Sequence, residues 1–149
     1  MKKHFFLLLS LCLLVLASCN KEKPINPFAT PEGCVKEYLN AEDSCDVARM
    51  LSCFSYDPKY ESIIREGLQE KLDKNAKNSS YYNDSTYYRN DSVVLKETYP
   101  NTAVVTVYYT FVSNGKDDFS DNYDLNLVKD STNWKLEARL SYSIESSFY

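Results

Sequence analysis

Residues 102–112 read Thr-Ala-Val-Val-Thr-Val-Tyr-Tyr-Thr-Phe-Val, and this stretch decides the fold. β-branched and aromatic side chains dominate it, and such side chains suit a pleated, half-buried surface. Asn114 and Gly115 follow closely. An Asn-Gly pair is the strongest short-range signal of a tight hairpin, because both residues tolerate a positive φ. The stretch therefore predicts a long strand that turns back into an antiparallel partner.

The chain on both sides of this strand also follows a period of two. Residues 92–98 predict a preceding strand, and a turn at 130–133 predicts a further one beyond the hairpin. One face of the strand after the hairpin is apolar except for Asp121, and it consists of Phe119, Tyr123, Leu125 and Leu127. The apolar face of the last strand consists of Trp134, Leu136, Ala138, Leu140 and Tyr142. We therefore expect an antiparallel meander of about four strands.

Three helices are predicted ahead of these strands. Thr30, Pro31 and Glu32 supply a cap residue, a proline at the first helical position and an acid in the first turn. Apolar residues at helical spacing follow in three groups: Cys34, Val35, Tyr38 and Leu39; Val47, Met50, Leu51 and Phe54; Tyr60, Ile63, Ile64, Gly67, Leu68 and Leu72. Helices followed by an antiparallel sheet predict an α+β fold.

Residues 74–91 contain polar residues and four tyrosines with almost no aliphatic side chains. We expect them to form a long connection or an irregular edge. The pairs Tyr81-Tyr82 and Tyr87-Tyr88 could act there as a recognition loop, because tyrosine gives contact area at low entropic cost. An edge strand is the alternative.

The N-terminus has the features of a secretory signal. Lys2 and Lys3 give a positive start, and the apolar run at 5–16 is shorter than the roughly 20 residues of a membrane span. The end of this run, Leu16-Ala17-Ser18-Cys19, resembles the bacterial lipobox. That resemblance implies cleavage before Cys19 and acylation of this cysteine. Ordinary secretion with cleavage after Ala17 is the alternative.

The expected organisation follows from this cleavage. Residues 1–18 form the signal peptide, 19–30 carry the lipid and a flexible tether, and 31–149 form one domain. Asn20 is not the aspartate that retains enterobacterial lipoproteins in the inner membrane, so we expect a cell-envelope protein of the outer membrane, on either face.

The amino-acid composition argues against several kinds of binding and catalysis. The formal net charge is −4, which argues against a nucleic-acid partner. The sole histidine, His4, lies in the signal peptide, so the mature chain has no histidine for catalysis or metal binding. We expect no metal and no cofactor. The acidic residues Asp117, Asp118, Asp121 and Asp124 lack EF-hand spacing, and we interpret them as the solvated end of a hairpin.

The order of helices and strands resembles the NTF2-like cone fold, and more specifically the DUF4878 type of small bacterial lipoprotein, over residues 31–142. The matching segments are Pro31-Glu32-x-x-Val35-x-x-Tyr38-Leu39 with Ala41, Asp46-Val47-Ala48-x-Met50-Leu51, Ala103-Val104-Val105-Thr106-Val107, and the Leu-Val-Lys-x-x-x-x-Trp-Lys-Leu segment at 127–136. The resemblance implies a helix-covered curved sheet around a conical cavity, and domains that often dimerise through their sheets. These motifs concern packing, so they imply a fold and not an activity.

Three functions remain open. We expect a protein without catalytic activity that binds a small ligand or an envelope partner, with a pocket lined by Tyr109, Asp121, Tyr123, Trp134 and Tyr142. The first alternative is a cavity enzyme of the isomerase or dehydratase type. It would use a partly buried Asp121 as the base with Tyr109 or Tyr142 opposite. The second is a protein-docking module that acts through the sheet face or residues 78–91.

Three cysteines remain in the domain after processing, namely Cys34, Cys45 and Cys53. Cys34 and Cys53 are the most plausible disulfide pair, because they lie nearly symmetrically about the turn between the first two helices. The alternative is that all three are reduced and buried, since cysteine packs well as a small apolar side chain.

Overall fold

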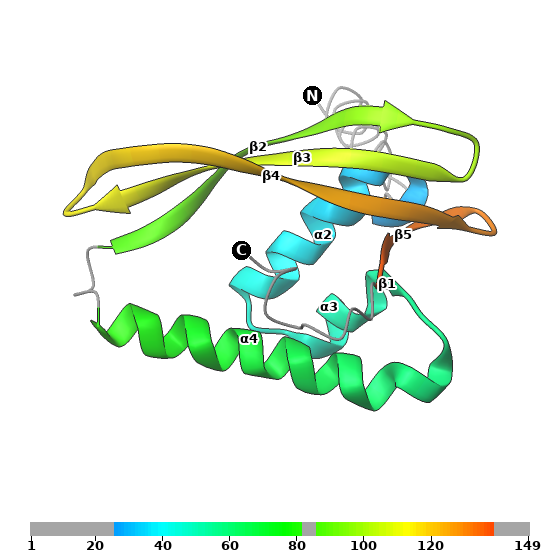
Figure 1. Ribbon diagram of the computed structural model, residues 1–149, viewed down its shortest axis with the longest axis horizontal. Helices are drawn as coiled ribbons and strands as arrows, with labels where there is room; N and C mark the ends of the chain where they lie inside the picture. The colour runs from blue at the N-terminus through cyan, green and yellow to red at the C-terminus, as the bar shows by residue number, and fades with distance from the viewer. Residues whose placement is uncertain (1–25, 82–85, 139–149) are drawn as a thin grey trace, which may run out of the picture.

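A computed structural model describes residues 26–81 and 86–138, with backbone only for 76–81. The helices are α2 (Pro31–Asp43), α3 (Val47–Ser52) and α4 (Glu61–Tyr81), with short 3-10 turns η1 (Pro27–Ala29) and η2 (Pro58–Tyr60). The strands are β1 (Phe54–Ser55), β2 (Thr86–Thr98), β3 (Thr102–Ser113), β4 (Lys116–Asp130) and β5 (Asn133–Glu137). Figure 1 shows the long strands in one twisted layer, with the helices on one side of it.

The strands form one sheet in the order β1-β5-β4-β3-β2. The meander β2-β3-β4-β5 is antiparallel, as predicted. The two-residue strand β1 was not expected, and it pairs in parallel with β5, so the sheet is mixed. Two residues are too few to show a period of two, which is why the sequence gives no signal for β1.

Of the two alternatives predicted for 74–91, the long connection is wrong, and the irregular edge is confirmed for 86–91, because β2 is the edge strand of the sheet. Helix α4 continues to Tyr81, and strand β2 begins at Thr86, leaving only 82–85 between them. The polar pair Asn90 and Asp91 lies inside β2 at a register shift on the edge of the sheet. Polar residues are tolerated at such bulged edge positions. Tyr87 and Tyr88 therefore belong to a strand, and the side chains of Tyr81 and Tyr82 lie outside the described residues.

Both predicted turns are confirmed. Asn114 and Gly115 have φ values of 52° and 72° between β3 and β4. Two consecutive positive φ values are those of the tight turn whose twist matches a hairpin. Ser131, in the turn between β4 and β5, has a φ of 57°.

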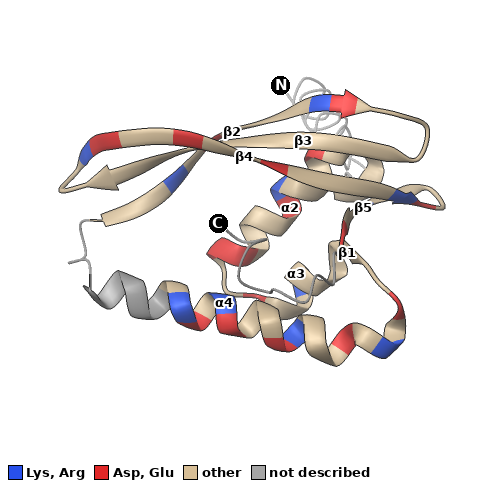
Figure 2. Cartoon of the chain, in the orientation of Figure 1, with Lys and Arg blue, Asp and Glu red and all other residues tan. Residues whose placement is uncertain are grey.

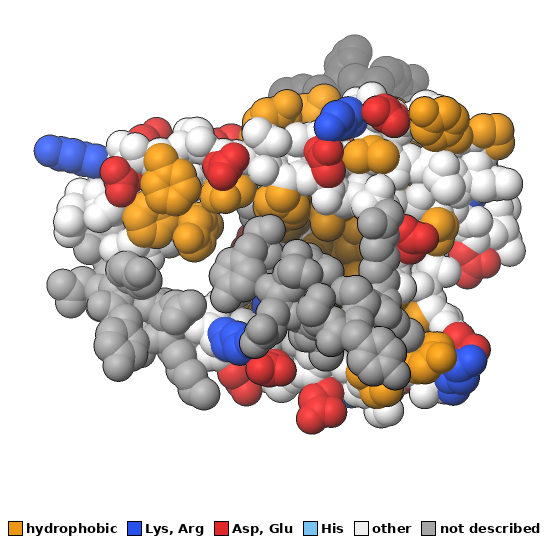
Figure 3. Space-filling view, in the orientation of Figure 1, with side chains coloured by type: hydrophobic (Ala, Val, Ile, Leu, Met, Phe, Trp, Pro, Cys, Tyr) orange, Lys and Arg blue, Asp and Glu red, His pale blue; other side chains and the backbone are white. Residues whose placement is uncertain are grey.

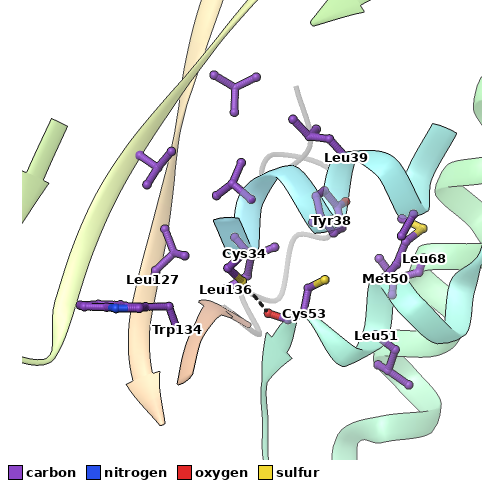
Figure 4. Packing of buried hydrophobic residues seen from close by; sticks show 14 of the residues in the cluster. Cys34, Tyr38, Leu39, Met50, Leu51, Cys53, Leu68, Leu127, Trp134 and Leu136 are labelled. Carbon is purple, nitrogen blue, oxygen red and sulfur yellow. Dashed lines mark hydrogen bonds between the residues drawn. The ribbon is translucent and has the colours of Figure 1, made fainter. Parts of the chain in front are cut away.

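The core lies between the helices and one face of the sheet, which we call the helix-facing face. Ala103, Val105 and Val107 of β3 are at most 2% exposed, and they pack with the predicted inner residues of α2. Figure 4 shows Leu127, Trp134 and Leu136 on the strand side of this core, with Met50, Leu51 and Leu68 on the helix side. Of the predicted inner residues, Ile63 is 48% exposed. Phe54 packs against the core as predicted, but it does so from β1 and not from a helix.

The folded part begins before the predicted boundary at Pro31. The Asn26 side-chain amide donates to the Asn133 side-chain oxygen at 3.1 Å. Phe28 packs against the core, and the Lys135 ammonium lies 3.8 Å from the centre of its ring. Residues 26–30 thus belong to the domain and not to the tether. Among the described helices, none is long and apolar enough to cross a membrane. Residues 1–18, predicted to be a signal peptide, and Cys19 lie outside the described residues.

Candidate functional site

The helix-facing face of the sheet continues as a row of aromatic side chains beyond the core. The positions alternate along each strand, so Tyr109 and Phe111 follow Val105 and Val107 on the same side of β3. Phe111 of β3 lies between two aromatic neighbours in the register, Tyr88 of β2 on one side and Phe119 of β4 on the other. Tyr123 of β4 is opposite Val107. We call the resulting set the aromatic wall, and it comprises Tyr88, Tyr109, Phe111, Phe119 and Tyr123.

The rings of the aromatic wall are in mutual contact. Ring centres lie 5.6 Å apart for Tyr88 and Tyr109, and 5.9 Å apart for Tyr109 and Tyr123. Phe111 lies 5.0 Å from Tyr88 and 5.2 Å from Phe119. These separations are those of favourable aromatic pairs, so the rings support one another as a continuous surface.

The described helices leave much of this surface open. Tyr88 is 64% exposed and Phe119 is 47% exposed, whereas Tyr109, Phe111 and Tyr123 are half-buried. Figure 3 shows hydrophobic side chains gathered on the underside of the sheet at its left end. An apolar surface left exposed in this way is typical of a binding site.

Asp121 lies within the aromatic wall, directly opposite Tyr109 on β4. The partly buried carboxylate that the cavity-enzyme alternative requires is not observed, because Asp121 is exposed and accepts a hydrogen bond from the backbone N–H of Asn122 at 2.8 Å. Burial raises the pKa of Tyr109 above its ordinary value, and electrostatic interactions with Asp121 and Tyr88 raise it further. Tyr109 therefore stays a neutral hydroxyl at physiological pH.

A polar cluster lies between the helices near the inner end of the aromatic wall. The Lys71 ammonium on α4 is 2.8 Å from a carboxylate oxygen of Glu42 on α2, and it donates to the Tyr38 hydroxyl at 3.0 Å. Side chains of Lys71 and Glu42 are only 21% and 18% exposed. We call these three residues the Lys71 cluster. Figure 2 shows α4 with many acidic and basic residues along its length. Lys71 is one of them, and its ion pair with Glu42 connects α4 to α2.

Electrostatics link the Lys71 cluster to the aromatic wall. Burial alone lowers the pKa of Lys71, but Tyr38 and Glu42 more than offset it, and the pKa is raised above its ordinary value. Burial, assisted by Glu42 and Tyr38 and opposed by Lys71, raises the pKa of Tyr123 to about 12. Tyr123 therefore lies within electrostatic range of the Lys71 cluster and joins it to the exposed rings.

Neither Lys71 nor Glu42 was predicted to be a site residue, although the sequence contains a signal for both. Lys71 is three residues after Leu68 and seven after Ile64, so it falls on the inner stripe of α4. Glu42 is four residues after Tyr38 on α2. A charged residue on an inner stripe requires a partner when it is buried. Opposite charges on two such stripes could have indicated the pair.

A groove of about 460 Å³ runs between α2 and β2 beside the aromatic wall. Asn90, which is opposite Tyr109 in the register, forms part of its wall together with Lys36 and Asp43. The site therefore combines an apolar surface with a polar flank, as small-molecule sites commonly do.

Of the two other residues predicted to line the pocket, Trp134 lies elsewhere and Tyr142 is not described. Trp134 is 7% exposed within the core, with the Lys129 ammonium 5.6 Å from the centre of its ring. Its aromatic ring serves packing and not ligand contact. Tyr142 lies outside the described residues.

The three domain cysteines are free thiols in the structure. Cys34 and Cys53 are buried, and the Cys34 thiol donates to the backbone carbonyl oxygen of Cys53 at 3.6 Å (Figure 4). Hydrogen bonding with the Cys53 side chain, together with burial, raises the pKa of Cys34. The two residues are neighbours, as the disulfide hypothesis requires, and their pairing stays a prediction. Cys45 is exposed, which corrects the expectation of three buried cysteines.

The acidic hairpin residues divide between the two faces of the sheet. Asp117 accepts two hydrogen bonds of 3.1 Å from Arg89, and Asp124 accepts hydrogen bonds from Lys96 and Thr106 on the outer face. Asp121 lies on the helix-facing face. Within residues 26–75 and 86–138, no three metal-ligating side chains come together.

No protein-family model and no curated protein sequence matches the chain. Among solved structures, it is similar to a proposed NTF2-like transpeptidase from Campylobacter jejuni, with 13% identity and a TM-score of 0.51 over 74% of this chain and 99% of the other. It is also similar to a Nostoc punctiforme protein of unknown function with a cystatin-like fold, at 18% identity and a TM-score of 0.47 over 72% and 87% of the two chains. A proposed scytalone dehydratase from Novosphingobium aromaticivorans has 16% identity and a TM-score of 0.43 over 71% and 78%. The arrangement of helices on the sheet is thus an NTF2-like fold.

Proposed function

We propose that this protein binds a small, largely apolar or aromatic ligand on the aromatic wall, without chemical conversion. The observation that supports this most directly is the contiguous row of five rings, two of which are about half exposed or more. A monomer rarely leaves such a surface open without a use for it. The neighbouring groove and the Lys71 cluster supply polar groups that would orient a ligand.

A role without catalysis agrees with the chemistry of the site. An acid–base catalyst needs a group that exchanges protons near neutral pH in contact with substrate. The mature chain contains no histidine, and Asp121 is a solvent-exposed carboxylate. The pKa values of Tyr109 and Tyr123 are raised, so neither is a base at neutral pH.

Ligand binding is tested by titrating the chain with the fluorescent apolar probe anilinonaphthalene sulfonate. Tyr109→Ala removes the central ring of the aromatic wall, and Tyr108→Ala is the matched control because Tyr108 is on the outer face. We expect Tyr109→Ala to weaken probe binding by about tenfold, the equivalent of roughly 1.4 kcal/mol of lost ring contact. Tyr108→Ala should leave it unchanged. Equal effects of the two variants would refute the assignment.

We further propose that Cys19 anchors the domain to the cell envelope, as the DUF4878-type lipoprotein resemblance implies, with the outer membrane as its destination. Several acyl chains would hold the protein at a membrane almost permanently, since each buried methylene contributes about 0.8 kcal/mol. Expression with a labelled fatty acid should label the wild type and leave Cys19→Ser unlabelled. Recovery of unlabelled wild-type protein from the aqueous extract would contradict the anchor.

A further inference from the structure

Asp121 places a negative charge among the rings of the aromatic wall. It is directly opposite Tyr109, and the alternation of side chains puts Phe119 and Tyr123 on either side of it along β4. Asp121 is exposed, and an exposed carboxylate is negatively charged at neutral pH. The same charge contributes to the raised pKa of Tyr109, so the carboxylate and that ring lie within electrostatic range of each other. A ligand on the aromatic wall would therefore lie beside a negative charge.

This charge has no cationic partner within residues 26–75 and 86–138. Asp117 and Asp124 of the same strand each form an ion pair with a basic residue of β2. The ammonium of the Lys71 cluster is already paired with the carboxylate of that cluster. No described lysine or arginine forms an ion pair with Asp121, whose carboxylate accepts the hydrogen bond from the backbone N–H of Asn122. A ligand could supply the compensating positive charge.

The rings around Asp121 suit a cation as well as an apolar group. The face of an aromatic ring carries negative partial charge, and it attracts a cation that lies within about 6 Å of the ring centre. The ring centres of Tyr109 and Tyr123 are 5.9 Å apart, with the ring planes inclined by 50°. Those of Tyr88 and Tyr109 are 5.6 Å apart, with an inclination of 70°. A cation against Tyr109 can therefore be within reach of a second ring, and the rings and the carboxylate attract the same sign of charge.

The groups present on the aromatic wall favour one kind of cation. A metal ion needs several oxygen ligands, and within the described residues no three metal-ligating side chains come together. A primary ammonium group is strongly hydrated and has three N–H donors, for which the rings of Phe111 and Phe119 offer no acceptor. A quaternary ammonium group has no N–H donor, and its alkyl groups are apolar. Aromatic side chains recognise such groups through their ring faces.

We propose that the ligand of the aromatic wall carries a quaternary ammonium group, which lies against Tyr109 and beside Asp121. This inference rests on the proposed function, because it names the chemistry of the ligand that the aromatic wall would bind. Asp121 acts through its charge and takes part in no proton transfer. Its role is to favour a cationic ligand over a neutral one of the same shape.

Two probes of the same shape test the proposal on the full chain. They are choline and its neutral isostere dimethylbutanol, in which a carbon atom replaces the charged nitrogen, and NMR titration gives the dissociation constant of each. We expect the wild type to bind choline about fivefold more tightly than the isostere. Asp121→Asn keeps the shape of the side chain and removes its charge, so it should weaken choline binding by about fivefold and leave isostere binding unchanged.

Asp130→Asn is the matched control for Asp121→Asn. It removes the same charge from the other end of β4, nine residues away, or about 30 Å along the strand. Solvent and salt screen an exposed charge at that distance, so this variant should bind choline as the wild type does. No measurable choline binding, equal affinity of the wild type for choline and the isostere, or equal choline affinity of the wild type and Asp121→Asn would overturn the proposal.

Titration with anilinonaphthalene sulfonate separates this proposal from the proposed function. That probe is an anion, so Asp121→Asn should bind it at least as tightly as the wild type does. Tyr109→Ala should weaken the binding of both choline and the anionic probe. If choline fails these tests while Tyr109→Ala still weakens probe binding, the aromatic wall is a site for an uncharged ligand. If Tyr109→Ala has no effect on probe binding, the proposed function itself fails.

Discussion

Lys71 shows how a single residue in this fold depends on its partners. Its ammonium is held by Glu42 and Tyr38 in a setting that is about four-fifths buried. Removing one member of a buried ion pair leaves the other charge without compensation. Losing Lys71 would therefore leave the Glu42 charge unpaired and lower the stability of the folded domain.

We expect Lys71→Met to lower the free energy of unfolding by about 2–3 kcal/mol, somewhat less than for a fully buried pair. Lys74→Met is the matched control, because Lys74 pairs with Glu70 on the same helix with both side chains more than half exposed. That variant should change stability by less than about 0.5 kcal/mol. Urea unfolding measures both, and similar losses in the two variants would show that Lys71 has no special role.

Tyr123 gives the site a dependence on pH. Its pKa is raised to about 12 in the folded state, against about 10 in an unfolded chain. The folded state thus holds the phenolic proton more tightly, so this contribution to stability is complete below pH 10 and is lost as the pH rises toward 12. We expect the urea midpoint of the wild type to fall more steeply between pH 10 and 11.5 than that of Tyr123→Phe. Parallel curves would contradict the assignment.

At the level of elements, the first turn of α2 fixes how the N-terminal segment enters the domain. The Thr30 hydroxyl caps the helix by accepting from the Gly33 N–H at 3.1 Å. A Cβ at Gly33 would collide with the backbone carbonyl oxygen of Pro27 and lie 2.9 Å from the Thr30 hydroxyl oxygen. Glycine at this position lets η1 pack directly on the helix.

Gly33→Ala should therefore destabilise the protein by more than about 1 kcal/mol, since backbone cannot yield as a side chain can. Gly67→Ala on α4 is the matched control, because nothing lies within 4 Å of its added methyl group. Alanine is the better helix former, so this variant should gain up to about 1 kcal/mol. Thermal unfolding compares them, and a stabilised Gly33→Ala would disprove the close approach.

Elements with strong periodicity could be predicted from the sequence, and those determined by tertiary context could not. The alternation in 102–112 and the Asn114-Gly115 turn identify β3 and its hairpin correctly. The polar start of β2 could be predicted only as one of two alternatives, because its tyrosines are fixed by pairing with Phe111 and Val112, which local patterns do not reveal. The alternation of side chains along the strands likewise indicated that Tyr109 and Asp121 share a face of the sheet. It did not show that the Asp121 carboxylate is exposed.

At the scale of the whole molecule, the two ends of the sheet have different roles. At the end near β5, aliphatic residues and Trp134 fill the space under the helices as a packed core. At the opposite end, the same face carries rings that the described helices leave open. This division explains why the sequence pattern is continuous along β3 although only part of the face is core. Which part of this face becomes core depends on where the helices pack, and the residue pattern of a strand does not reveal that.

Native mass spectrometry of the protein isolated from its own host cells tests the central claim most directly. The account predicts a bound small molecule that is released on denaturation and that is missing or strongly reduced in Tyr109→Ala, while Tyr108→Ala retains it. A wild-type protein with only its own covalent mass in every preparation, or a bound molecule retained equally by Tyr109→Ala, would contradict the claim that the aromatic wall is a ligand site.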